Sequence, residues 1–242
     1  MAALQILCYG DSHMADSRSL GRRPATYADS LQTSLQTRGH DHKVSSSSLS
    51  GVTAHTMVRK VNHAAILDGT GRPHKGLALR LLDKPDLVII MAGASDLAEG
   101  FSPEDTLRRV AELHEVCHEL GIATIAVAPP VERHGHLRQT RDRFARLLQR
   151  WSRLKAGCCS KTGCVAQYID AEHSLPKSRG NYWESDGLHF SPAGAREFGR
   201  VLTSALAPTL REMARDKSFQ GEEAESSTSW VRSVLKVAVS KV

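Results

Sequence analysis

The chain has 242 residues, of which 40% are hydrophobic and 24% are charged, a balance typical of a soluble globular protein. No apolar run approaches the ~20 residues that a membrane-spanning helix needs, which excludes a spanning segment. The formal net charge is +6, but the basic residues are spread along the chain and form no block, so the charge gives no support to a nucleic-acid partner. The length suits one α/β domain or two small ones, and we expect one.

The cysteines are odd in number, and their spacing matches no zinc-binding pattern. Cys8 falls in a predicted strand and Cys117 in a predicted helix, so we expect both to act as small core residues. The N-terminus has no basic stretch followed by a long apolar region, so we expect no secretory signal. We therefore expect reduced thiols and a cytoplasmic protein. The five cysteines are Cys8, Cys117, Cys158, Cys159 and Cys164.

In the first half of the chain, predicted strands and helices alternate. Apolar residues four apart, such as Tyr27 and Leu31, predict a helix. Asp86–Met91 is the clearest strand, because an almost wholly apolar run is typical of a central parallel strand covered on both faces. We expect strands over 4–9, 42–48 and 86–91, helices over 24–37 and 53–66, a loop over 69–76 and a helical turn over 77–82.

The second half of the chain continues this alternation. Ser102-Pro103 and Ser191-Pro192 each combine an N-cap serine with a first-turn proline, which predicts the start of a helix. The helix predicted over 139–155 has one apolar face, which includes Leu154, and a set of arginines, Arg141 among them, that we interpret as a solvated face. We expect strands over 122–128 and 165–169, and helices over 103–120, 139–155 and 192 to about 207. Such alternation favours a parallel, doubly wound sheet.

The composition changes near the C-terminus, where residues 213–229 are polar and predict a linker. Residues 230–242 place apolar side chains at helical spacing among basic ones. Such a segment can pack on its own domain, contact a membrane surface or a partner protein, or fray. We expect a main domain over 1–212, a linker over 213–229 and an amphipathic helix or tail over 230–242.

Polar residues follow three predicted strands at the point where each strand ends. Gly10-Asp11-Ser12 follows the first strand, Ser50-Gly51 the second and Gly93-Ala94-Ser95-Asp96 the third. In a doubly wound sheet these strand ends lie at one edge, so the three segments can converge. Ser12 is therefore a candidate nucleophile, although Gly, Asp and Ser are also ordinary turn residues.

A nucleophilic serine needs a base, because its hydroxyl reacts weakly near neutral pH. The segment Asp186-Gly187-Leu188-His189 offers one just before the last helix of the main domain. In a tight loop, the Asp186 carboxylate can bind one imidazole nitrogen of His189 and leave the other to face Ser12. The three side chains are a candidate catalytic triad.

Together these motifs resemble those of the SGNH or GDSL hydrolases. That family has a Gly-Asp-Ser near the N-terminus, a glycine after the second strand, a Gly-x-Asn-Asp after the third and an Asp-x-x-His near the C-terminus. The resemblance spans residues 4 to about 210. It implies a flavodoxin-like three-layer α/β/α sandwich with a central parallel sheet of about five strands, and a serine hydrolase that acts on ester bonds. It implies no metal and no organic cofactor.

One position departs from the family pattern. Ser95 stands where the family has an asparagine that donates to the oxyanion. The resemblance implies an oxyanion hole made by the N–H groups of Ser12 and Gly51 and by the Ser95 side chain. A serine hydroxyl reaches less far than an asparagine amide, and the loss of one such donor typically costs ~10²–10³ in turnover.

We predict a serine esterase or acyl hydrolase that forms an acyl-enzyme on a small ester or acyl-lipid substrate. An acyltransferase, in which a hydroxyl acceptor replaces water, is an alternative. A second alternative is a binding protein with the hydrolase fold and weak or no activity, for which Ser95 is the support. A third is a peripheral membrane protein recruited through residues 230–242, and contact with a protein through the same segment also stays open.

Overall fold

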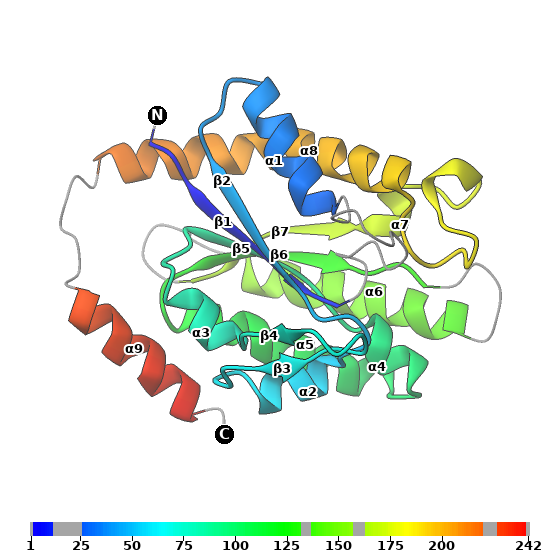
Figure 1. Ribbon diagram of the computed structural model, residues 1–242, viewed down its shortest axis with the longest axis horizontal. Helices are drawn as coiled ribbons and strands as arrows, with labels where there is room; N and C mark the ends of the chain where they lie inside the picture. Colours follow the sequence, from blue (N-terminus) through cyan, green and yellow to red (C-terminus); the bar gives the residue numbers. More distant parts are fainter. Residues whose placement is uncertain (1, 12–25, 132–136, 157–162, 220–226, 241–242) are drawn as a thin grey trace.

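The fold is built on a five-stranded sheet with helices on both faces (Figure 1). The computed structural model describes residues 2–11, 26–131, 137–156, 163–219 and 227–240. All strand pairs in this sheet are parallel, in the order β2-β1-β5-β6-β7, which confirms the predicted architecture. The strands are β1 (Gln5–Gly10), β2 (Lys43–Ser48), β5 (Leu87–Met91), β6 (Ala123–Ala128) and β7 (Val165–Asp170).

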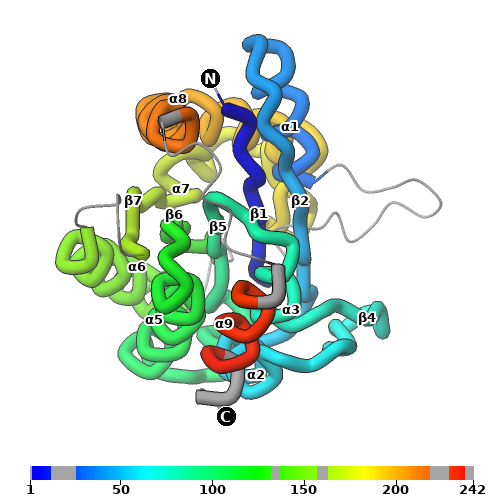
Figure 2. Tube along the Cα trace, turned by 90° about the vertical axis from the view of Figure 1, so that its left-hand side faces the viewer, coloured from blue at the N-terminus to red at the C-terminus, as the bar shows by residue number. Residues whose placement is uncertain are grey.

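Two apolar cores lie on opposite faces of the sheet, because side chains alternate along a strand. Leu7 and Tyr9 of β1 face one core, and Ile6 and Cys8 face the other. Figure 2 shows the sheet between two helical layers. One layer holds α1 (Tyr27–Thr37), α7 (Ala171–Ser174) and α8 (Pro192–Phe219); the other holds α2 (Ala54–Arg59), α3 (Leu77–Leu81), α4 (Ala94–Ala98), α5 (Pro103–His118), α6 (Leu137–Lys155) and α9 (Ser227–Ser240).

The two predicted helix starts are confirmed, but one predicted helix end is wrong. The Ser102 hydroxyl accepts a hydrogen bond from the Asp105 amide and caps α5, and α8 begins directly after Ser191. However, α8 does not stop near residue 207 but continues to Phe219. Leu206, Leu210 and Ala214 are buried at four-residue spacing, so the apolar stripe carries the helix into the segment expected to be a linker.

The helix predicted over 53–66 is also wrong, because α2 ends at Arg59. A short antiparallel hairpin follows, formed by β3 (Ile66–Leu67) and β4 (Pro73–His74) in the segment expected to include a loop. The chain doubles back so closely that a Cβ on Gly76 would lie 2.4 Å from the carbonyl oxygens of Lys60 and Val61. This contact between distant residues prevents a continuous helix.

The solvated arginine face predicted for α6 is wrong at Arg141. This side chain is buried, and its guanidinium donates to both carboxylate oxygens of Asp170 and to the Pro129 carbonyl. Leu154, expected on the apolar face, is instead 77% exposed. The helix therefore does not divide simply into an apolar face and a solvated basic face, because Arg141 is buried together with its partner Asp170.

The cysteine expectations are confirmed in part. Cys8 and Cys117 are buried and carry unbridged thiols, as core residues. The expectation of reduced thiols is wrong for Cys164, which is disulfide-bonded. Cys158 and Cys159 lie outside the described residues.

Helix α9 packs against its own domain beside α3 (Figures 1 and 2). The Trp230 indole N–H donates to the Leu81 carbonyl at 3.0 Å, and the side chains of Val234 and Val237 are buried. Own-domain packing, one of the alternatives for this segment, is therefore what the structure contains. Among the described residues, no helix is long and apolar enough to cross a membrane.

Candidate active site

The end of β1 lies between β2 and β5 and leaves no room for a side chain. Gly10 pairs with Ser48 on one side and Met91 on the other. A Cβ on Gly10 would lie 1.8 Å from the Met91 carbonyl oxygen, so only glycine fits. The buried Asp11 follows, and its carboxylate accepts a hydrogen bond from the Ala94 amide at 3.0 Å. Ser12, the candidate nucleophile, lies outside the described residues.

The end of β2 leads into a turn that contains Gly51. This residue has a φ of +69°, a left-handed conformation that glycine adopts without strain. The Gly69 amide donates to the Ser50 carbonyl at 2.7 Å, so the loop of the β3–β4 hairpin braces the turn from outside. Gly51 itself is exposed.

The end of β5 carries Ser95 and Asp96 in the first turn of α4. Gly93 precedes them with a φ of +111°. Ser95 is half-buried, whereas Asp96 is buried and its carboxylate accepts hydrogen bonds from the amides of Ala54 and His55, at 2.7 and 3.2 Å. Burial raises the pKa of Asp96, and these two hydrogen bonds oppose the rise. Asp96 thereby ties the end of β5 to the start of α2, three residues beyond Gly51.

The fourth motif forms a compact loop between α7 and α8. The Asp186 Oδ1 accepts hydrogen bonds from the amides of Leu188 and His189, at 2.9 and 3.0 Å. The Oδ2 lies 2.9 Å from the His189 Nδ1. Burial acts to raise the pKa of Asp186, but the hydrogen bonds from the His189 ring and from the two amides outweigh it, and that pKa falls to about 2. The carboxylate is therefore ionised at neutral pH and fixes the orientation of the imidazole.

The base of this loop is closed by paired main-chain contacts. Trp183 and Phe190 form an antiparallel bridge, and the Glu184 amide donates to the His189 carbonyl at 2.9 Å. Gly187 turns the chain with a φ of +64°. The loop follows α7, which begins where β7 ends, so it emerges at the same edge of the sheet as the other motifs (Figure 1).

The structure sets the three strand-end motifs side by side and pairs Asp186 with His189, while Ser12 lies outside the described residues. Sequence reasoning missed the bracing roles of Asp11 and Asp96, although a carboxylate next to a strand end is a signal for such a role. Within the described residues, no group of three His, Cys, Asp or Glu side chains could hold a metal ion.

Residues 8–197 match the family model described as the GDSL-like lipase/acylhydrolase family. The chain belongs to this family. It is therefore an enzyme of the ester-hydrolysing class, and the matched region contains all four motifs. A search of curated proteins finds no match.

Solved structures of lipolytic proteins and esterases share the fold at low sequence identity. A member of the lipolytic G-D-S-L family from Desulfitobacterium hafniense has a TM-score of 0.63 at 16% identity and covers 84% of this chain and 99% of its own. The lipase/acylhydrolase from Enterococcus faecalis has a TM-score of 0.59 at 21% identity, with coverage of 85% and 96%. A psychrotrophic esterase from Pseudoalteromonas, in a structure inhibited by monoethylphosphonate, has a TM-score of 0.60 at 16% identity, with coverage of 86% and 98%.

Proposed function

We propose that the enzyme hydrolyses small esters or acyl-lipids through an acyl-enzyme on Ser12. The observation that carries the proposal is the hydrogen bond between Asp186 and His189 in a member of the GDSL family. An ionised carboxylate at Nδ1 holds the proton on that nitrogen and leaves Nε2 as the base. Ser12 directly follows the end of β1 in the sequence, and we propose that its hydroxyl gives its proton to that base.

The reaction has two half-steps. The Ser12 Oγ attacks the ester carbonyl while the His189 Nε2 takes the hydroxyl proton, and the same proton then passes to the departing alcohol. Water attacks the acyl-enzyme, gives its proton to His189, and releases the acid as the Ser12 Oγ regains the proton. The N–H groups of Ser12 and Gly51 and the Ser95 hydroxyl stabilise the oxyanion. With a hydroxyl acceptor in place of water, the same intermediate gives an acyltransferase.

Hydrolysis of p-nitrophenyl esters from acetate to palmitate tests this function. We expect turnover in the wild type and none above background in Ser12→Ala. Ser204→Ala removes an exposed hydroxyl from α8 and is the matched control, which should keep full activity. The acyl chain length that is hydrolysed fastest indicates the length of the acyl-binding pocket. Absence of turnover in folded wild-type protein would favour the binding protein that the serine at position 95 first suggested.

Contact of residues 230–242 with a membrane or a partner protein stays a prediction, as does a cytoplasmic location. Among the α9 side chains that the structure describes, those of Val231 and Leu235 are large, apolar and exposed, at 39% and 49%. Replacing both with serine should reduce pelleting with liposomes if this face binds a membrane. The substitutions leave the hydrogen bond of Trp230 to Leu81 in place, and unchanged pelleting would contradict membrane binding by this face.

A further inference from the structure

Lys177 lies against the loop that holds Asp186 and His189. Its Nζ donates a hydrogen bond to the Gly187 carbonyl oxygen at 2.5 Å and lies 3.4 Å from the centroid of the Trp183 ring. The side chain is only 11% exposed. A lysine with so little exposure is rare unless it is paired, so these contacts mark a specific role for the ammonium group.

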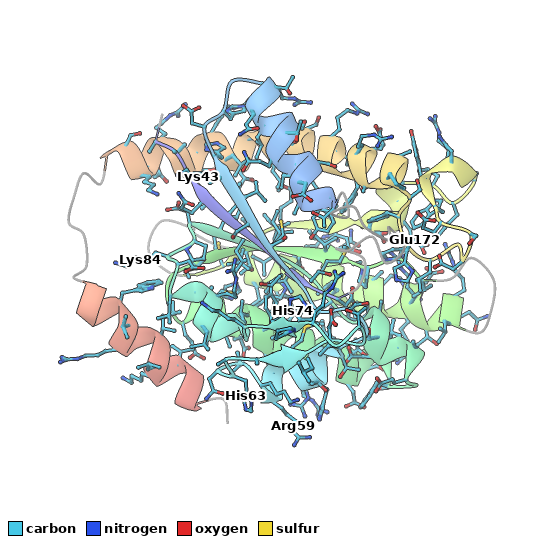
Figure 3. All side chains as sticks on the ribbon, in the orientation of Figure 1. Lys43, Arg59, His63, His74, Lys84 and Glu172 are labelled. Carbon is cyan, nitrogen blue, oxygen red and sulfur yellow. The ribbon has the colours of Figure 1, made fainter. Side chains whose placement is uncertain are left out.

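The partner that holds Lys177 in place is Glu172 of α7, 3.8 Å from the ammonium group. Glu172 is buried, accepts a hydrogen bond from the Val131 amide at 2.9 Å, and pairs with Arg138 at 2.6 Å. Val131 follows β6, and Figure 3 labels Glu172 beside the loop that leads to α8. Through Glu172, Lys177 therefore joins that loop to α7 and to the segment that follows β6.

The hydrogen bond to Gly187 acts on a single peptide group. The carbonyl of the Gly187–Leu188 peptide accepts from Lys177, and the N–H of the same peptide donates to the Asp186 Oδ1 at 2.9 Å. Because a peptide group is planar, fixing its carbonyl also fixes the direction of its N–H. The Lys177 ammonium thus controls a donor that orients the Asp186 carboxylate.

We propose that Lys177 is a positioning residue for the Asp186–His189 pair. It acts through the Gly187–Leu188 peptide and the loop, and its hydrogen bond is strongest while the amine is charged. This proposal rests on the proposed function, because it gives Lys177 a role in orienting the pair that activates Ser12.

The charge on Lys177 responds to pH in an accessible range. Burial lowers the pKa of Lys177 to about 8, although Glu172 opposes the change. Arg138 and Arg141 of α6 lower it further, and Asp186 raises it. The amine therefore loses its proton above about pH 8, which weakens its contacts with the Gly187 carbonyl and the Trp183 ring.

The test compares Lys177→Met and Lys177→Arg with Lys217→Met. Lys217 is a matched control, because its Nζ also donates to a main-chain carbonyl, that of Ala3 at 3.3 Å, and to a carboxylate, that of Asp86 at 2.8 Å. Two quantities are measured: hydrogen exchange of the Leu188 amide, and the pH dependence of kcat and KM for the best p-nitrophenyl ester.

We expect Lys177→Met to speed exchange of the Leu188 amide and to lower kcat about tenfold with little change in KM, since misplaced catalytic groups slow the chemical step. We expect the kcat of the wild type to fall above about pH 8, where Lys177 loses its proton, and we expect no such fall in Lys177→Met. Lys177→Arg keeps the charge and should recover part of kcat, with the fall moved to higher pH. Lys217→Met should match the wild type.

Unchanged Leu188 exchange together with an unchanged kcat and pH profile in Lys177→Met would overturn the proposal. Equal losses in Lys177→Met and Lys217→Met, without a change in pH profile, would also overturn it. Full activity in Ser12→Ala would instead contradict the proposed function. The exchange measurement does not need activity, so Leu188 exchange that stays at the wild-type rate overturns the proposal even where no ester is turned over.

Discussion

The two parts of the candidate site are held by different kinds of contact. At the strand ends, the carboxylates of Asp11 and Asp96 accept hydrogen bonds from amides 83 and 42 residues away, those of Ala94 and Ala54. In the loop before α8, the Asp186 carboxylate accepts from amides two and three residues along the chain. Tertiary packing therefore builds the first part, and local turn chemistry builds the second.

The same contrast appears in solvent exposure and in pKa. Asp96 is 1% exposed and burial raises its pKa, whereas the Asp186 side chain is 26% exposed and its hydrogen bonds bring the pKa down to about 2. A buried carboxylate that only braces the backbone can function with a raised pKa. A carboxylate that orients a base must stay ionised, so its pKa must stay low. The loop is held mainly by local contacts, and in our proposal Lys177 fixes it further through its hydrogen bond to the Gly187 carbonyl.

The largest expected effect comes from Asp186→Asn. An asparagine amide disfavours the tautomer in which Nδ1 carries the proton, so kcat should fall by about 10³–10⁴-fold, the scale known for such triads. The unfolding free energy should also fall at neutral pH, because the ionised carboxylate accepts hydrogen bonds from the His189 ring and from two amides. A tenfold loss or less in ester hydrolysis would contradict the role given to this carboxylate.

At the strand ends, Gly10→Ala should act on stability. The added methyl meets the Met91 carbonyl oxygen, so we expect a loss of about 3 kcal/mol or more in urea unfolding. Gly180→Ala is the matched control, because nothing lies within 4 Å of its Cβ position. Equal stability of the two variants would show that β1 and β5 are not packed as described.

Removal of the buried brace by Asp96→Ala should cost about 2–3 kcal/mol, because the amides of Ala54 and His55 lose their acceptor. Ester hydrolysis should also fall, since the turn at Gly51 precedes those amides directly. Asp83→Ala removes an exposed, ion-paired carboxylate and should stay within about 0.5 kcal/mol of the wild type. A loss of ester hydrolysis without a loss of unfolding free energy would contradict the bracing role and would indicate that Asp96 takes part in the reaction.

The pH dependence of stability distinguishes the loop from the strand ends. The folded-state pKa of Asp186 is depressed, so its contribution is present above the unfolded pKa of about 4 and is lost as the pH falls towards about 2. The difference in unfolding free energy between the wild type and Asp186→Asn should therefore shrink between pH 4 and pH 2. A difference that stays constant across this range would contradict the hydrogen-bonded, ionised carboxylate.

The smallest effect is expected from Ser95→Asn. If Ser95 is a weaker oxyanion donor than asparagine, this change should raise kcat about tenfold, part of the ~10²–10³ that one donor contributes. Ser95→Ala should lower kcat. A fall in kcat with asparagine would mean that the site is shaped around the serine hydroxyl.

The features predictable from the sequence are those that neighbouring residues encode. The apolar run 86–91, the proline-marked helix starts and the Asp186–His189 turn each depend on residues within a few positions. The hairpin over 66–74 and the bracing by Asp96 depend on contacts across the fold, which no local pattern encodes.

The role proposed for Lys177 could not be predicted from the sequence either. It lies nine residues before Asp186 with no motif around it, and only the folded loop brings its ammonium to the Gly187 carbonyl. Arg141 likewise fits a solvated stripe until Asp170 is placed beside it.

Labelling with a fluorophosphonate probe, followed by peptide mapping, tests the central claim most directly. Such a probe phosphonylates an activated serine, so the wild type should carry one adduct on the peptide that contains Ser12. Ser12→Ala should carry none, and Asp186→Asn should label much more slowly. An adduct on another serine, or equal labelling of the wild type and Ser12→Ala, would contradict the account of Ser12 as the nucleophile.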